Sequence, residues 1–359
     1  MKILLLGDAS NYHSALGQGL SRLGHEVTVA SHGSRWMDTN RDIDIGRKSG
    51  KVGGALLWLK LNTVLASRLK GYDVVQLVNP IFVELRPHRV AAMFRKLKRN
   101  NGGIFLTALG TDTPYVEMAF LENCPLRYTE FAVDGKPTPL TLSDAGQNHR
   151  LWLKDPLRSH TRYIYENVDG VVSALYEYHL AVERYMPDLK LAYGGIPIDV
   201  DSLPFASRRD GDAPIRVLAA YHSGRESEKG MDVMLKIAES VANINLQHAS
   251  GLDFKSFMNR LTQSDIVLDQ LYSYTPATTA LMAMAMGKTV VTGAEPDFEK
   301  FIGEKVPAIN VSPLHPESLA DFLSNPGDLE ERGKAARDFV RRNNDVTVVA
   351  ERFLNLWTS

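Results

Sequence analysis

Two cations lie in the segment whose residue types most clearly suggest chemistry, AAYHSGRESEKGMDVMLKIAE (219–239). A buried strand is expected to end here, a glycine turn carries Arg225, and Lys229 with Gly230 opens a helix. Cations beside the free N–H groups of a helix N-terminus, at the carboxyl end of a strand, form a binding site for phosphate groups. The segment therefore predicts a diphosphate site, and the alternative interpretation is a charged turn in solvent.

Polar side chains also follow the first predicted strand, KILLLG (2–7), where the chain continues with Asp8, Asn11, Tyr12 and His13. These groups suit hydrogen bonding to a sugar or another polar acceptor, and the alternative is a solvent-facing loop that caps a helix. The glycine fingerprint of dinucleotide-binding folds is missing at this turn, and the chain has no Walker-type phosphate loop.

Acidic residues follow several predicted strands of the first half, namely Asp8, Glu84 and Asp112. Asp112 is the strongest candidate because Gly110 would let a ligand approach closely, and its alternative role is to cap a turn. An Asp-x-Asp string at 199–201 could suggest a metal-dependent transferase, but it lies in a segment with another explanation, given below. We therefore expect no metal site.

The elements that must position these groups alternate between apolar strands and amphipathic helices, twice along the chain. In the first half we expect strands at 2–7, 25–31, 72–78, 103–109, 169–174 and 189–195, with helices around 16–23, 55–70 and 86–100. In the second half we expect strands at 215–221, 243–249, 265–271, 288–293 and 308–312, with helices at 229–242, 254–263 and 278–286. The last 45 residues look helical with a break at 343–344, and 113–160 fits no period, as in loops that close over ligands.

A chain of 359 residues is too long for one hydrophobic core. The strand–helix alternation predicts parallel sheets with helices on both faces, so the fold class is α/β with two doubly wound, Rossmann-like domains. A segment rich in Gly, Pro and Asp, 194–214, marks their junction. We place the domains at 1–195 and 196–344.

Composition narrows the function classes. The single cysteine, Cys124, excludes a disulfide framework and a zinc site built from several thiolates. Residues 1–190 carry a net charge of +5 and the rest −6, so the first half suits anionic surfaces or substrates but is not as basic as a nucleic-acid-binding domain. The apolar run at the start is too short for a signal peptide, and no run could cross a bilayer, so we expect a cytoplasmic protein.

The order of several motifs resembles the glycosyltransferases of the GT-B fold, family four (group 1) in particular. The Gly-Arg turn and the Lys-Gly helix start are the first of these motifs. A second is GGIPIDVDSLPF (194–205), which is similar to the segment that links the two domains in that family. A third is SDIVLDQL followed by LMAMAMGKTVVTG (281–293). The resemblance extends from Lys2 to Trp357. It implies that the terminal helix VAERFLNLW (349–357) returns to the first domain, so that 345–359 belongs there.

The resemblance implies a retaining transfer of a sugar from a nucleotide-diphosphate donor, without a metal or other cofactor, in the cleft between the domains. The leaving diphosphate would be held by Arg225 and Lys229, which we group with Asp112 as catalytic candidates. Further candidates at the donor and nucleotide site are His222, Ser223, Gly224, Tyr274, Thr278, Thr279 and Met282; those at the acceptor site are Asp8, Asn11, Tyr12, His13 and Gly110. The alternatives are a structural role for His222 and helix packing for Met282.

The chain departs from the family at two glutamates, whose positions are taken by Tyr274 and Met282. A thioether cannot accept hydrogen bonds from a ribose as a carboxylate does. The Arg225–Lys229 spacing is one residue shorter than in the family, and Leu109 stands where a histidine is common. The alternative function is therefore a catalytically degenerate GT-B protein that binds a glycan or a partner. A nucleotide-sugar epimerase would need an acid–base pair that we do not identify.

The expected partners are a nucleotide sugar and a glycan or lipid-linked acceptor of a polysaccharide pathway, with no nucleic acid. Two helical stretches also predict peripheral contact of the first domain with an anionic membrane. Residues 55–70 place Leu57, Leu61, Val64 and Leu65 on one face and Trp58 and Leu59 off it, and 86–100 surrounds an apolar stripe with cations that include Lys96, Lys98 and Arg99. The alternative is the ordinary solvated outer face of two Rossmann helices.

Overall fold

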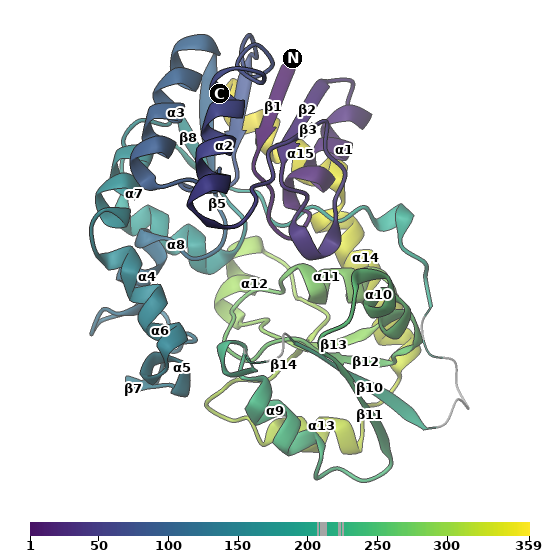
Figure 1. Ribbon diagram of the computed structural model, residues 1–359. Helices are drawn as coiled ribbons and strands as arrows, with labels where there is room; N and C mark the ends of the chain where they lie inside the picture. The colour runs from purple at the N-terminus through teal and green to yellow at the C-terminus, as the bar shows by residue number, and fades with distance from the viewer. Residues whose placement is uncertain (207, 209–213, 222–223, 225) are drawn as a thin grey trace. The chain divides into compact units, whose positions relative to one another are not determined.

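The computed structural model describes residues 1–206, 208, 214–221, 224 and 226–359. They form two compact units (Figure 1). The first unit contains Met1–Met118, Asn148–Pro197 and Val346–Ser359, and the second contains Ala119–Gln147 and Ile198–Asp345. This grouping places 119–147 with the second unit, whereas the sequence-based boundaries include it in the first domain. The α/β fold with two Rossmann-like units is confirmed.

The first unit is built on a seven-stranded sheet in the order β3-β2-β1-β4-β5-β8-β9, and all its strand pairs are parallel. Its strands are β1 (Lys2–Leu6), β2 (Glu26–Ser31), β3 (Ile43–Asp44), β4 (Val74–Leu77), β5 (Gly103–Ala108), β8 (Gly170–Ser173) and β9 (Leu191–Tyr193). The strands are rich in Ile, Leu and Val because helices cover both faces of the sheet. Strand order reverses between β1 and β4, which makes their carboxyl ends the expected place for a ligand.

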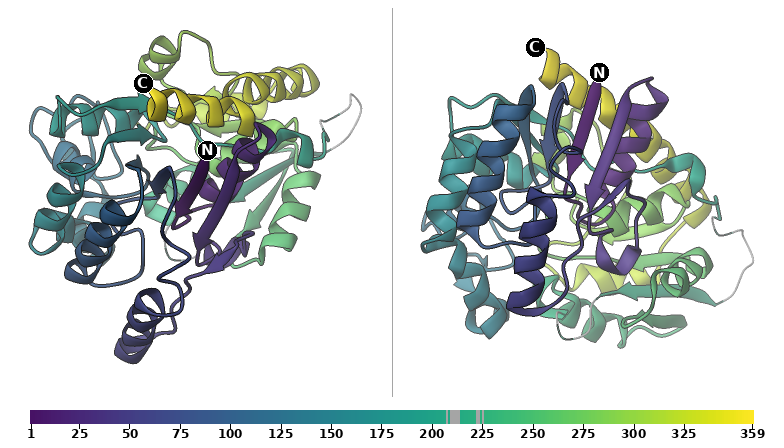
Figure 2. Two further views of the ribbon diagram at one scale, coloured as in Figure 1. Left: turned by 90° about the horizontal axis from the view of Figure 1, so that it is seen from above. Right: turned by 45° about the horizontal axis from the view of Figure 1, so that its top comes forward.

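The helices of the first unit are α1 (Tyr12–Arg22), α2 (Gly50–Asn62), α3 (Pro87–Asn100), α4 (Thr113–Ala119), α7 (Leu157–Tyr165), α8 (Tyr176–Tyr185) and α15 (Val346–Thr358). The terminal helix α15 runs beside α1 (Figure 2), as predicted. A Cβ on Gly19 would lie 2.0 Å from the carbonyl oxygen of Val346, so a glycine is needed where the two helices meet. The break between the last two helices falls at Asp345, one residue after the predicted position.

The helix predicted at 55–70 begins and ends earlier. α2 spans Gly50–Asn62, and Leu57 and Leu61 on its buried face were predicted correctly. The prediction that Val64 lies on this face was wrong, because Val64 follows the end of the helix and is 72% exposed. In α3 the predicted apolar face is confirmed, since Val90, Met93, Phe94 and Leu97 are buried.

The second unit has a five-stranded parallel sheet in the order β11-β10-β12-β13-β14. Its strands are β10 (Ile215–Ala220), β11 (Ile244–Ala249), β12 (Ile266–Leu268), β13 (Thr289–Thr292) and β14 (Ile309–Asn310). Its helices are α9 (Met231–Ala238), α10 (Phe254–Gln263), α11 (Thr278–Ala285), α12 (Pro296–Ile302), α13 (Ser318–Ser324) and α14 (Leu329–Asn344). The order reverses between β10 and β12.

Within the segment that fits no sequence period, residues 119–147, here called the excursion, contain only short elements: a hairpin of the two-residue strands β6 (Ala132–Val133) and β7 (Lys136–Pro137), then α5 (Pro139–Leu142) and the start of α6 (Asp144–His149). Such short elements cannot bury a core of their own. The excursion is held instead by a buried carboxylate of the second unit, described below.

Candidate functional sites

The candidate donor site lies where the strand order of the second unit reverses. The turn before α9 follows β10 and the turn before α11 follows β12, and these two strands are hydrogen-bonded neighbours. Both turns therefore lie at the carboxyl edge of adjacent parallel strands, where doubly wound sheets bind ligands. The two turns also touch directly, because the N–H of Leu271 donates to the carbonyl oxygen of Lys229 at 2.8 Å.

Lys229 is held by a buried carboxylate. Its Nζ lies 2.8 Å from Oδ1 of Asp269, a residue with no exposed surface. The other oxygen, Oδ2, accepts a long hydrogen bond of 3.4 Å from the hydroxyl of Thr292. Because an ammonium group has three donors, Lys229 can bind Asp269 and still donate to a phosphate oxygen. Asp269 thus fixes the direction of the ammonium group, a role that its sequence position alone did not reveal.

The predicted helix start at Thr278 and Thr279 is confirmed as the first turn of α11. Its N-cap residue is Ala277, no side chain caps the helix, and no acidic residue stands in its first turn. Both threonines are half-buried. The N–H groups of such a turn carry a partial positive charge that favours an anion.

Three of the predicted donor-site residues, Arg225, His222 and Ser223, lie outside the described residues. Gly224 has φ +78° with no atom within 4 Å of a Cβ added there, and its N–H donates to Oε1 of Glu226 at 3.0 Å. This backbone conformation favours glycine, and the open space beside it is compatible with close approach of a ligand.

Tyr274 and Met282, the two positions where the resemblance leads us to expect glutamates, are buried. The hydroxyl of Tyr274 accepts a hydrogen bond of 2.7 Å from the N–H of Arg127, and its ring packs against that of Tyr128 with centroids 4.8 Å apart. Burial raises the pKa of Tyr274. Met282 and Met284 on α11, and Met286 at its C-cap, are buried, as packing of this helix would require. Tyr274 thus anchors the excursion 119–147, and both roles differ from that of a carboxylate open to a ribose.

Glu295 is a residue that the sequence did not single out. It is buried, and its Oε1 accepts hydrogen bonds from the Tyr128 hydroxyl at 2.6 Å and from Nδ2 of Asn310 at 3.0 Å. Its Oε2 pairs with the guanidinium of Arg127. Glu295 and Tyr274 therefore attach the excursion to the sheet of the second unit. The only sequence signal was an acid just before the proline that opens α12.

In the first unit, the turn after β1 forms a buried polar cluster. Oδ1 of Asp8 accepts the N–H of His13 at 2.9 Å, and Oδ2 accepts the Thr39 hydroxyl at 2.8 Å. Nδ1 of His13 lies 2.7 Å from the carbonyl oxygen of Gly7, which can only accept, so Nδ1 carries the proton. Burial lowers the pKa of His13 to about 4, although the Asp8 carboxylate acts in the opposite direction.

This tautomer leaves the lone pair on Nε2, which is buried without a hydrogen-bond partner among the described residues. The solvent-facing alternative for His13 is therefore wrong. A neutral imidazole with a free acceptor nitrogen suits a hydroxyl donor, such as that of a sugar. The histidine stays neutral at physiological pH.

Asn11 and Tyr12 have different local roles. Asn11 is in the left-handed region with φ 66° and precedes α1, and its side chain does not cap that helix. The Tyr12 hydroxyl donates to the carbonyl oxygen of Gly195 at 2.7 Å and is buried. Burial raises the pKa of Tyr12 well above its ordinary value. The Tyr12 hydroxyl thus supports the fold, whereas Asn11 remains available at the turn.

Asp112 is buried beyond β5, and no cation contacts it among the described residues. Its Oδ2 accepts the Tyr165 hydroxyl at 2.7 Å, and its Oδ1 accepts a weaker bond of 3.3 Å from the N–H of Tyr115. Burial raises the pKa of Asp112 to about 6, although both hydrogen bonds lower it. Gly110 has φ +77° and open space around a Cβ position. The turn-cap geometry is thus present, together with a pKa suited to proton exchange near neutral pH.

The Asp-x-Asp string has an ordinary structural role, since Asp201 forms an ion pair of 3.0 Å with Arg341. Within the described part of the chain, no three His, Cys, Asp or Glu side chains gather as a metal site would require. None of the described helices combines the length and apolar character needed to span a bilayer.

Comparison with solved structures defines the class of fold: the GT-B architecture of glycosyltransferases. Sucrose-phosphate synthase from Thermosynechococcus elongatus superposes with a TM-score of 0.66 at 12% identity, covering 100% of this chain and 98% of that one. HepE of Anabaena, solved with UDP and glucose, gives 0.59 at 13% identity, with 100% of both chains covered. The lipopolysaccharide outer core galactosyltransferase WaaB gives 0.51 at 12% identity, with 99% of both chains covered. No protein-family model and no curated protein sequence matches the chain.

Proposed function

We propose that the protein is a glycosyltransferase that moves a sugar from a nucleotide-diphosphate donor to a glycan or lipid-linked glycan acceptor of a polysaccharide pathway. The fold supports this proposal, and several similar structures, including that of HepE, were solved with UDP or UDP-glucose. The observation that carries it is the pair of adjoining turns where the strand order reverses between β10 and β12. In one turn Asp269 pairs with Lys229 and fixes the direction of its ammonium group, and the same turn leads to the N-terminus of α11, which no side chain caps. In this proposal the protein acts at the cytoplasmic side of a membrane.

The chemistry needs little from side chains. As the bond between the sugar and the diphosphate oxygen breaks, its electron pair leaves with the diphosphate, and an acceptor hydroxyl forms the new bond to the sugar. In this proposal Lys229, Arg225 and the N–H groups at Thr278 and Thr279 stabilise the charge that develops on the diphosphate. We propose a retaining transfer without a metal ion, in which Asp112 receives the acceptor proton and the neutral His13 accepts a hydrogen bond from an acceptor hydroxyl through its free nitrogen.

The proposal is tested by thermal stabilisation with a panel of nucleotide-diphosphate sugars. A donor whose free concentration is about 100 times its dissociation constant stabilises the native state by about 2.7 kcal/mol. Arg225→Ala should weaken binding of the donor that is found by roughly tenfold to a hundredfold, since charge-assisted hydrogen bonds contribute about 1.5–3 kcal/mol each. Lys236→Ala, an exposed cation on α9, is the matched control and should bind the donor normally. If no nucleotide sugar stabilises the protein, the proposal fails.

The alternative, a binding protein without transferase activity, is favoured by Tyr274 and Met282. Both are buried, and the Tyr274 hydroxyl is engaged by Arg127. A direct test is Met282→Glu, which would restore one acid. Tighter nucleotide binding by calorimetry would indicate a ribose site that has lost one contact. Weaker binding would indicate a pocket shaped for another ligand. Donor binding with no sugar release or transfer to any acceptor would favour the binding protein.

A further inference from the structure

The turn between β12 and α11, residues 269–277, carries the groups that shape the candidate donor site. It begins at Asp269, which directs Lys229, and it ends at Ala277, the N-cap residue of α11. The backbone between these two residues forms neither helix nor strand, so its shape depends on what it contacts. A displacement of this turn moves both the carboxylate that directs the ammonium group and the first N–H groups of α11.

The chain after β13 holds the backbone of this turn. A Cβ on Gly293 would lie 1.7 Å from the carbonyl oxygen of Ser273, so the two segments touch through their backbones. Next to this contact, the N–H of Glu295 donates to the carbonyl oxygen of Tyr274 at 3.2 Å. The Ser273 hydroxyl also donates to the carbonyl oxygen of Thr275 at 2.7 Å, which closes the turn locally. The backbone of the turn is therefore fixed next to β13.

The excursion holds the side chain at the middle of the same turn. The N–H of Arg127 donates to the Tyr274 hydroxyl at 2.7 Å, and the Tyr128 ring lies 4.8 Å from the Tyr274 ring, centroid to centroid. Tyr274 is 1% exposed. Because its hydroxyl and its ring are both engaged, the side chain of Tyr274 keeps its position only while the excursion keeps its own.

Glu295 links these two attachments. Its backbone N–H binds Tyr274, while its carboxylate accepts the Tyr128 hydroxyl at 2.6 Å and pairs with the Arg127 guanidinium. The Glu295 side chain is 2% exposed, whereas that of Arg127 is 54% exposed. A buried carboxylate is costly without its cation, so this ion pair decides whether the cluster forms.

The excursion and the turn each lack the regular structure that would hold them alone. Strands β6 and β7 of the excursion are two residues long each, and both ends of the excursion continue into the first unit, at Met118 and Asn148. Segments with few regular backbone hydrogen bonds open locally at a low cost in free energy. An attachment between two such segments orders both, so a ligand that fixes one of them also favours the other.

We propose that Arg127 and Glu295 are positioning residues of the donor site, which act through Tyr274 to hold residues 269–277 in the conformation that binds the diphosphate. The inference rests on the proposed function and assigns a task to the excursion. While the ion pair is formed, the middle of the turn is fixed, Asp269 keeps Lys229 directed, and the start of α11 stays in place. Because such coupling is reciprocal, a bound diphosphate also stabilises the excursion on the second unit.

The test measures binding of inorganic diphosphate to the full chain by calorimetry, since this probe needs no matching nucleotide base. Tyr274→Phe removes one hydroxyl and leaves every cation in place, and it should raise the dissociation constant by roughly twofold to tenfold. Arg127→Met should raise it by roughly fivefold to fiftyfold, and Arg127→Lys, which keeps a cation, should recover most of this loss. The matched control is Arg158→Met, which breaks the ion pair of a similarly exposed arginine with Glu117 in the first unit and should bind as the parent does.

Three results of this titration would overturn the inference. One is a parent protein that does not bind diphosphate. Another is a Tyr274→Phe variant that binds as the parent does, because a loss confined to Arg127→Met would mean that the guanidinium contacts the ligand itself. The third is an equal loss of affinity in Arg158→Met and Arg127→Met.

Hydrogen exchange gives a measurement that a purely structural role would not change. Saturating diphosphate should slow amide exchange in residues 126–134 of the parent, and it should do so less in Tyr274→Phe. Exchange in α3 of the first unit should stay the same in both proteins. Unchanged exchange in 126–134 of the parent would contradict the coupling. A protein that shows the coupling but binds no nucleotide sugar would refute the proposed function and not the positioning role.

Discussion

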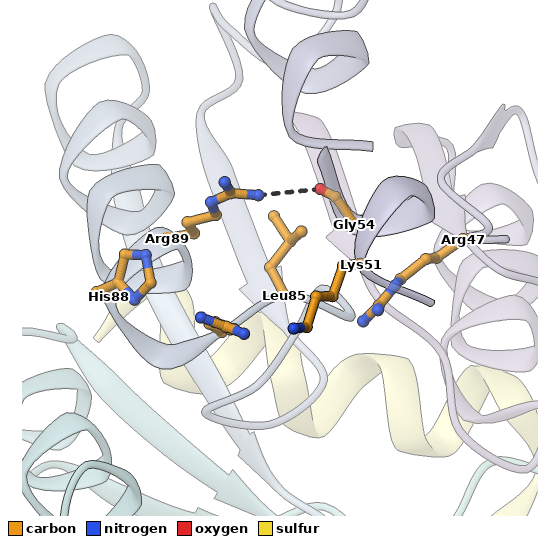
Figure 3. A pocket seen from close by; sticks show the side chains of 7 residues that line it. Arg47, Lys51, Gly54, Leu85, His88 and Arg89 are labelled. Atoms are coloured by element: carbon orange, nitrogen blue, oxygen red, sulfur yellow. Dashed lines mark hydrogen bonds between the residues drawn. The ribbon is translucent and has the colours of Figure 1, made fainter. Parts of the chain in front are cut away.

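The two units treat buried charge in opposite ways. In the second unit, buried carboxylates are paired with cations: Asp269 with Lys229, Glu295 with Arg127, and Asp265 with Arg216 and Arg208. In the first unit, Asp112 is buried without a cation contact in the described chain. Four cations that line a cavity after β3 and β4 (Figure 3), Arg47, Lys51, Arg86 and Arg89, form no ion pair among the described residues. Paired charges belong to the fold, whereas unpaired charges at a ligand-binding edge are available to a ligand.

The pKa directions of two buried aspartates follow this difference. Burial raises the pKa of both, but at Asp265 the hydrogen bonds and charge of Arg216 outweigh it and lower the pKa overall. At Asp112 burial dominates, because only a tyrosine hydroxyl and one N–H oppose it, and the pKa is raised to about 6. A neutral donor therefore compensates a buried carboxylate less than a guanidinium does.

The largest effect is expected from Lys229→Met. Among the described residues, this change leaves the buried Asp269 carboxylate with only the long bond from Thr292, and breaking a buried pair in this way costs about 3–5 kcal/mol. The free energy of unfolding, measured with urea, should fall by that amount. Lys236→Met on α9, the helix that follows Lys229, has an exposed side chain and should change the free energy of unfolding by less than about 0.5 kcal/mol. Similar values for both variants would show that Asp269 does not depend on Lys229.

An effect of about 3 kcal/mol is expected from the ionisation of Asp112. Because its pKa is higher in the native state than in the unfolded chain, the native state binds more protons between pH 4 and 6, and stability falls as pH rises through this window. A difference of about two pKa units corresponds to about 3 kcal/mol above pH 6. Asparagine does not ionise, so Asp112→Asn removes this pH-dependent loss. The free energy of unfolding of the variant minus that of the parent, measured in urea titrations, should therefore rise by about 3 kcal/mol between pH 4 and pH 7.5. A constant difference across this range would contradict the raised pKa.

The smallest effect is expected from Lys51→Ser. Because Lys51 is exposed and has no carboxylate partner in the described chain, the free energy of unfolding should change by less than about 0.5 kcal/mol. Lys48→Ser provides the reference for losing one exposed charge nearby. A loss of more than about 1 kcal/mol at Lys51 alone would mean that this cation supports the fold, and the contrast with Lys229 would disappear.

The fold could be predicted from the sequence because it rests on local patterns. Strands such as 2–7 and 215–221 are short apolar runs, and the helix at 254–263 was predicted at its observed bounds. The resemblance added the return of the terminal helix. The end of α2 was missed because Val64 and Leu65 continue the apolar spacing beyond Asn62, where the helix stops.

The pairing of side chains could not be predicted in the same way. Lys229 and Asp269 were each visible, but they are forty residues apart, and only the adjacency of β10 and β12 brings them together. Glu295 lies 168 residues from Arg127, so no local pattern marks it as the anchor of the excursion. The cationic cavity combines residues after β3 with residues after β4, and the two-residue strand β3 gave no periodic signal.

The return of α15 has a consequence for synthesis on the ribosome. The chain passes between the units four times, at 118/119, 147/148, 197/198 and 345/346, so no single cut yields either unit whole. The apolar residues Val349, Phe353 and Leu356 of α15 are buried in the first unit, yet they are translated about 340 residues after β1, which they help to cover. At a translation rate of roughly 5–20 residues per second, about 20 to 70 seconds pass between the synthesis of the first strands and that of α15. During that time the face of the first unit that α15 covers in the folded chain stays exposed, and exposed apolar surface of this kind favours aggregation.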